Sequence, residues 1–109
     1  MATFFKNSIV NSIGLEPVTI YETGPADRAT IIGLSLTNLT QNFVYVDVML
    51  KDDSSITGFY ARQILVGANT SLRLVNQGEK LIIAPNNVLM VRSSANDSID
   101  SILSYVEVV

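Results

Sequence analysis

The sequence predicts an all-β fold, an antiparallel β-sandwich of Ig-like or jelly-roll type that forms a single domain over residues 1–109. Turn-forming residues recur about every eight to twelve positions, which is the spacing typical of a sandwich or barrel. Runs of β-branched and aromatic residues, which favour strands, lie between the turns. No stretch holds the i, i+3, i+4 spacing of an amphipathic helix for long. A chain of 109 residues can bury a sizeable core without disulfides.

Nine strands are expected, and glycine, proline, asparagine and aspartate mark the turns between them, because these residues adopt turn conformations readily. The segment 56–66 has a one-turn helix as its alternative, but Gly58 and Gly67 enclose too short a stretch, so we predict a strand there. We expect residues 1–3 to form a mobile N-terminal end. The expected strands are 4–13, 17–23, 29–38, 42–51, 55–66, 70–76, 79–84, 87–93 and 99–108.

Alternation along a strand assigns its side chains to two faces. In the strand 29–38, Ile32, Leu34 and Leu36 are expected to share one face, and Ile31, Gly33, Ser35 and Thr37 the other. In the strand 99–108, the residues expected to point inward are Ile102, Val106 and Val108, and those expected to point outward are Leu103, Tyr105 and Glu107.

The strand 42–51 is apolar on both faces, which is unusual for a sandwich strand with one solvated side. Its valines at 44, 46 and 48 share one face, and Phe43, Tyr45 and Met49 form most of the other, with Asp47 between them. Two explanations stay open, namely cover by loops of the same chain and an interface with another chain, which we favour because Tyr, Phe and Met are enriched in interface cores. The predicted interface residues are Phe43, Tyr45, Met49, Phe59, Tyr60, Leu103 and Tyr105.

Composition argues against most kinds of chemistry. The chain has no histidine and no cysteine, which are the commonest general base and the thiolate ligand of metal sites. The formal net charge is -3 with only 7 Lys+Arg, so no basic stripe for nucleic acid is present. No apolar segment approaches the roughly 18 residues of a membrane span. The acidic pairs Asp52–Asp53 and Asp97/Asp100 lack a calcium-loop pattern and are interpreted as turn residues. We therefore expect no enzyme, cofactor, metal site, nucleic acid or membrane.

Five segments, in this order and over almost the whole chain, carry a resemblance: FKNSIVNSIGLEPVTIYE, ATIIGLSLTNLT, VYVDVMLKDDSS, LVGANTSLRLVNQGEKLIIAPNNVLMVRSS and SIDSILSYVEVV. Together they resemble small all-β structural proteins of tailed-bacteriophage virions. The resemblance implies a virion part that carries no catalytic residues and is assembled in the bacterial host cytoplasm. Its partners would be other copies of itself, with a trimer favoured, and virion proteins such as the major capsid protein.

Within that class, a capsid decoration (cement) protein that stabilises the head is the favoured function, because it suits a small protein with no long arm. The alternative is a neck, tail or baseplate component that forms a ring or a fibre attachment. A carbohydrate-binding module is a further alternative from another class, although the chain has no tryptophan for stacking on sugars.

Overall fold

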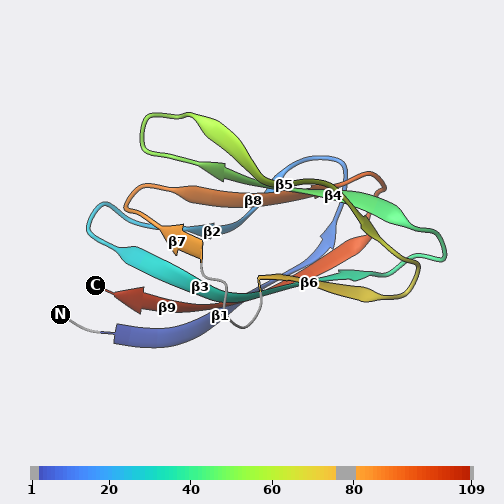
Figure 1. Ribbon diagram of the computed structural model, residues 1–109, viewed down its shortest axis with the longest axis horizontal. Coiled ribbons are helices and arrows are strands. Elements are labelled where there is room, and N and C mark those ends of the chain that lie inside the picture. The colour runs from blue at the N-terminus through green and yellow to red at the C-terminus, as the bar shows by residue number, and fades with distance from the viewer. Residues whose placement is uncertain (1–2, 76–80, 109) are drawn as a thin grey trace.

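A computed structural model describes residues 3–75 and 81–108 (Figure 1). All nine predicted strands are present in this part of the chain, including a strand instead of a helix over 57–66. Thr3 already belongs to the first strand, and residues 1 and 2 of the expected mobile end lie outside the described residues, as do residues 76, 79 and 80 of the expected strands. The strands are β1 Thr3–Ile13, β2 Val18–Glu22, β3 Arg28–Asn38, β4 Val44–Lys51, β5 Thr57–Val66, β6 Ser71–Val75, β7 Leu81–Ile83, β8 Val88–Ser93 and β9 Ile99–Val108.

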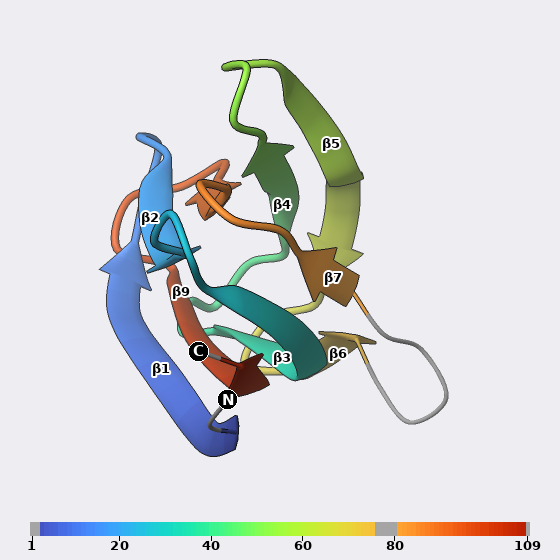
Figure 2. The ribbon, with the colours of Figure 1, turned by 90° about the vertical axis from the view of Figure 1, so that its left-hand side faces the viewer.

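The strands form two antiparallel sheets that pack face to face (Figure 2). Sheet A has the order β1-β9-β3-β6, with β7 paired to another part of β3, and sheet B has the order β2-β8-β4-β5. The chain changes sheet at most connections, and only β4–β5 and β6–β7 are successive strands of one sheet. This crossing order is that of a jelly roll, so of the two expected sandwich types the structure has the jelly roll.

The core lies between the two sheets and is built from alternate residues of nearly every strand. In β4, for example, Val44, Val46 and Val48 are buried in it, as the alternation predicts. The largest fully buried side chains are Ile13, Ile31, Leu34, Leu36, Ile83, Leu89, Ile99, Leu103, Val46, Val48 and Val66.

The side chain of Asn38 joins two turns at one end of the sandwich. Its Nδ2 donates to the backbone oxygens of Asn42 (2.8 Å), Val66 (3.1 Å) and Gly67 (3.1 Å), and its Oδ1 accepts from the backbone N–H of Thr40 (2.9 Å). A buried amide stays in place only when its polar atoms are paired, so these bonds hold the two turns together. The start of β4 is therefore held in a defined place.

The inward face of β3 differs from the prediction. The register between β3 and β9 shifts between Ile31 and Gly33, so Ile32 is the extra residue of a β-bulge. As a result Ile31 is buried together with Leu34, while Ile32 is exposed. A bulge reverses the phase of alternation, and therefore the expectation that Ile32 shares a face with Leu34 and Leu36 was wrong.

The faces of β9 are reversed relative to the prediction. Leu103 is fully buried and Tyr105 nearly so, whereas Ile102 is exposed. Ile102 and Leu103 are adjacent apolar residues, so alternation alone fits either orientation. The neighbouring strands decide it, because Leu103 lies opposite the core residue Leu34 of β3.

Candidate assembly surfaces

The seven predicted interface residues fall into two groups. Phe43, Tyr45, Phe59 and Tyr60 are exposed. Met49, Leu103 and Tyr105 are buried, and Leu103 and Tyr105 belong to the core between the sheets. The prediction that Leu103 and Tyr105 face outward is therefore wrong, while an interface role for the exposed residues stays a prediction.

Three exposed aromatic residues lie on the outer side of sheet B, and we call them the aromatic face: Phe43, directly before β4, Tyr45 of β4 and Phe59 of β5. The rings of Phe43 and Tyr45 meet edge to face, with centroids 5.6 Å apart. The backbone of Tyr45 is held by two bonds to Ser94, whose Oγ accepts from the Tyr45 N–H at 2.9 Å and whose N–H donates to the Tyr45 oxygen at 2.9 Å. Met49 lies opposite Phe59 and Met90 in the two neighbouring strands, which explains its burial.

An ion pair stands in the middle of this face. The Arg92 Nε donates to Asp47 Oδ2 at 2.8 Å, and the Gln63 N–H donates to Asp47 Oδ1 at 2.7 Å. Burial alone would raise the pKa of Asp47, but the Gln63 N–H and the Arg92 guanidinium together hold it below its ordinary value. Arg62 and Arg92 also lie over the Phe59 ring, 5.2 Å and 5.9 Å from its centroid. Phe59 is therefore held by two cations.

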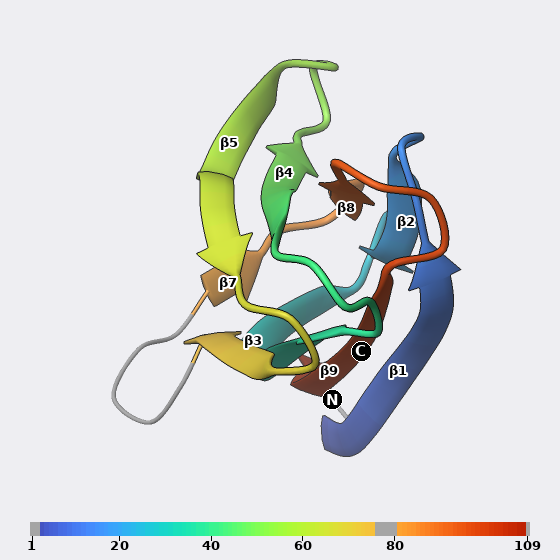
Figure 3. The same ribbon diagram turned by 90° about the vertical axis from the view of Figure 1, so that its right-hand side faces the viewer.

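The β4–β5 hairpin projects away from the rest of the sandwich (Figure 3). Its turn is shaped by Asp52, whose Oδ1 accepts from the Ser54 hydroxyl (2.8 Å) and from the N–H groups of Ile56 (3.0 Å) and Ser54 (2.9 Å), and these bonds lower the pKa of Asp52. A shallow pocket of about 310 Å³ lies along the hairpin. The residues that line it are Leu50, Asp52, Ile56, Gly58, Phe59 and Tyr60.

The outer side of sheet A carries a second exposed surface, which sequence reasoning missed. Phe5 and Ile9 of β1 and Ile102 of β9 lie on it, since Ile9 is opposite Ile102 and Phe5 is opposite Val106. Ile82 of β7 lies on the same outer side, near the sheet edge opposite β1. We call Phe5, Ile9, Ile82 and Ile102 the aliphatic face. The spacing of Phe5 and Ile9, four residues apart on one predicted strand, was a signal that could have found it.

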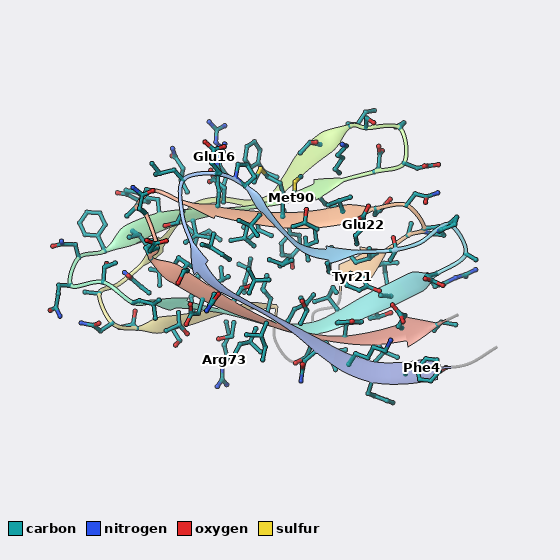
Figure 4. The ribbon with its side chains drawn as sticks, turned by 180° about the vertical axis from the view of Figure 1, so that it is seen from behind. Phe4, Glu16, Tyr21, Glu22, Arg73 and Met90 are labelled. Carbon is teal, nitrogen blue, oxygen red and sulfur yellow. The ribbon has the colours of Figure 1, made fainter. Side chains whose placement is uncertain are left out.

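The two outer sides are opposite each other in Figure 4, where Arg73 points away from the sandwich on the side of sheet A and Met90 lies on the side of sheet B. Beside Arg73, a small hollow of about 160 Å³ opens on sheet A, and its lining includes Gly33, Ile102 and Ser104.

A polar cluster closes one end of the sandwich between the sheets. The Tyr21 hydroxyl donates to Glu107 Oε2 at 2.7 Å, and the Lys6 Nζ lies 3.1 Å from Glu107 Oε1. The Tyr21 ring lies against that of Tyr105, with centroids 4.3 Å apart. Burial, followed by the bond to Glu107, raises the pKa of Tyr21, and the Tyr21 and Lys6 bonds lower the pKa of Glu107. These pairings satisfy the polar groups of the cluster, which is the pattern of a structural site.

No grouping of residues suited to metal binding occurs in the described part of the chain. Within residues 3–75 and 81–108, no three or more His, Cys, Asp or Glu residues gather as metal ligands would. Among the same residues, no helix long and apolar enough to cross a membrane is found.

Comparison with known proteins shows the fold of this chain. No protein-family model and no curated protein matches the sequence. A chain of Bacillus endospore appendages, described as a novel family of disulfide-linked pili, matches with a TM-score of 0.59 and 9% identity over 96% of this chain and 86% of that chain. A chain of the T13 IBDV viral particle matches with a TM-score of 0.58 and 10% identity over 96% of this chain. This chain covers only 30% of that viral chain. These similarities establish the β-sandwich.

Proposed function

We propose that this chain is a non-enzymatic structural subunit, and specifically a capsid decoration (cement) protein of a tailed-bacteriophage virion. The observation that carries the proposal is the aromatic face of sheet B, where Tyr45 of β4, Phe59 of β5 and Phe43, directly before β4, are exposed. The sequence resemblance to structural proteins of tailed-phage virions supports the proposal that the assembly is a phage virion. Fold similarity to a pilus chain and to a viral-particle chain is consistent with it.

The aromatic face has the properties of a binding surface whose side chains are already ordered. The Tyr45 ring meets that of Phe43 edge to face, and the Phe59 ring lies beneath Arg62 and Arg92. Ordering a side chain at an interface costs free energy, so residues that are already ordered contribute more of their burial to affinity. Tyr and Arg are also the types enriched among residues that dominate binding energy. We propose that this face binds neighbouring copies of the major capsid protein in the virion.

The test is co-sedimentation of the purified chain with undecorated heads from the same phage. The variant Tyr45→Asp should weaken head binding by about 30-fold, as expected when an interface anchor worth about 2 kcal/mol is lost. Leu15→Asp is the matched control, since Leu15 is as exposed as Tyr45 (53% against 46%) but lies in the β1–β2 turn. Equal binding by wild type and Tyr45→Asp would reject the aromatic face, and no binding by the wild type would reject the decoration function.

A second candidate function is favoured by the hairpin pocket, in which Phe59 and Tyr60 stand near the carboxylate residue Asp52. Aromatic rings beside a hydrogen-bonding carboxylate form a surface on which a sugar can stack. This candidate predicts binding on a glycan array, with loss of the signal in Tyr60→Ala and an unchanged signal in Tyr45→Ala. An array without any bound glycan would eliminate it.

A further inference from the structure

Strand β1 forms one edge of sheet A over its whole length. In the described part of the chain it pairs with β9 alone, from Thr3 opposite Val108 to Val10 opposite Ser101, before the register shifts. Beyond that shift, the Ile13 oxygen accepts the Ser98 N–H, so this end of the strand is used within the chain. In an antiparallel edge strand, every second residue directs its N–H and C=O away from the sheet. The segment 3–10 therefore presents a row of backbone groups suited to pairing with another strand.

This edge lacks the features that usually prevent strand pairing. The segment 3–10 has no proline and one charged residue, Lys6, whose Nζ lies 3.1 Å from Glu107 of the same chain. The other sheet edges are shorter or less regular, because β6 and β7 are short, β2 is short and has a register shift, and β5 has two register shifts in its pairing with β4. Short, bulged or charged edges resist pairing, so β1 is the edge most open to it.

The side chains of β1 that face outward are apolar and strongly exposed. Phe5 is 79% exposed and Ile9 is 66% exposed, and both stand on the aliphatic face of sheet A. Asn7 lies midway between them. When two copies of a strand pair antiparallel about a two-fold axis, each residue lies opposite one residue of the other copy. The two residue numbers of every such pair add up to the same sum, which defines the register. A sum of 14 places Phe5 opposite Ile9 of the second copy and Asn7 opposite Asn7.

We propose that two copies of this chain form a dimer by antiparallel pairing of their β1 strands, with Asn7 at the two-fold axis. Sheet A then continues across the dimer, and two aromatic–aliphatic pairs form on its outer side. Such cross-strand pairs stabilise a sheet by about 0.2 to 1 kcal/mol each. On the inner side, Phe4 lies opposite Val10, and Lys6 lies opposite Ser8.

Other registers are less favourable. Side chains directly opposite each other point to the same side of a sheet, so only even sums are allowed. A sum of 12 places Lys6 opposite Lys6, and like charges in that position repel. A sum of 16 places Phe5 opposite Asn11, beyond the point where the register of β1 shifts. A sum of 10 uses only residues 3–7.

The edge is complementary to itself, which is why a second copy is the occupant. Although the chain carries a formal net charge of -3, the segment 3–10 brings no acidic residue to the contact. Seven residues per copy make a contact near the small end of specific interfaces, so the dimer should dissociate on dilution. The dimer uses a different surface from the aromatic face and does not depend on the decoration function. The two-fold contact gives pairs, so a trimer would need another surface.

The first test is light scattering on the full chain over a range of concentrations. The wild type should approach twice the 11.9 kDa of one chain as its concentration rises. Ile9→Lys should weaken the dimer at least tenfold, because it places an unpaired charge at the new sheet contact. The control Ile82→Lys changes a residue of similar exposure (61%) on the same side of sheet A but away from β1, and should dimerise as the wild type does. A monomer at every concentration would overturn the proposal.

The second test uses the absence of cysteine from the chain. Asn7→Cys places one thiol directly opposite its copy, at a Cα separation of about 4.5 to 5.5 Å, which a disulfide can span. Mild oxidation should therefore yield a covalent dimer. In Asn11→Cys, the thiol lies on the same strand but opposite no copy of itself, and should remain free. Equal cross-linking of both variants would contradict the register. A trimer dissociated by Tyr45→Asp and unchanged by Ile9→Lys would overturn the β1 dimer and support the aromatic face.

Discussion

The outer faces of the two sheets differ in how their exposed apolar side chains are held. On sheet B, Phe59 lies beneath two arginines, and the Asp47–Arg92 ion pair stands among the rings. On sheet A, Phe5 and Ile9 stand on an edge strand whose one charged pair, Lys6–Glu107, belongs to the polar cluster at the end of the core. An ordered aromatic surface with charges suits a specific foreign partner, whereas a strand edge whose outward side chains carry no charge suits a second copy of itself.

Substitutions on the inner and outer sides of β9 should differ most in their effect on the free energy of unfolding. Leu103→Ala should lower the free energy of unfolding by about 2 to 5 kcal/mol, because it leaves a cavity in the core. Its neighbour Ile102→Ala, on the aliphatic face, should cost less than about 1 kcal/mol. Urea unfolding followed by circular dichroism measures both. Similar losses in the two variants would mean that β9 has no distinct inner and outer sides.

A substitution in the polar cluster at the end of the core should lower the free energy of unfolding by an intermediate amount. Tyr21→Phe removes a hydroxyl that donates to the Glu107 carboxylate, which should cost about 1.5 kcal/mol at pH 7. The raised pKa of Tyr21 means that the folded state holds this proton more tightly than the unfolded state. Its contribution is therefore complete below the ordinary tyrosine pKa of about 10 and is lost as the pH rises above it. Unfolding at pH 7 and at pH 10.5 measures this. A stability difference between wild type and Tyr21→Phe that grows at the higher pH would refute the assignment.

Removing the Asp47–Arg92 ion pair of sheet B should lower the free energy of unfolding least. Asp47→Asn keeps an acceptor for the Gln63 N–H and removes the charge, at a cost of about 1 kcal/mol, since the Arg92 side chain is 40% exposed and partly screened. The pKa of Asp47 is lowered in the folded state. Its contribution is therefore present above the ordinary aspartate pKa of about 3.9 and is lost as the pH falls through the lower folded-state value.

Thermal unfolding at pH 6 and pH 2.5 measures the Asp47 contribution. The difference between wild type and Asp47→Asn should shrink at the lower pH. Asp53→Asn, in the exposed β4–β5 turn, is the control and should match the wild type at both values. A constant difference for Asp47→Asn would show that its charge does not stabilise the folded state.

Local sequence patterns were sufficient to predict the number and places of the strands and the all-β class, because turn residues and side-chain alternation act over a few neighbouring positions. The same patterns predicted the inward face of β4, where the alternation of Val44, Val46 and Val48 runs without interruption, whereas Met49 on the other face is buried. They also identified the exposed rings of the aromatic face.

The orientation of β3 and β9 and the identity of the free edge strand depend on how the strands pair in the folded chain. The bulge at Ile32 reverses the phase of β3, and the orientation of β9 follows from its pairing with β3 and β1. Leu103 was therefore expected outside and lies in the core, and Phe5 and Ile9 are exposed because β1 has one neighbour. Strand order depends on contacts between residues far apart in the chain, such as Ile9 with Ile102. Local sequence patterns do not predict such contacts.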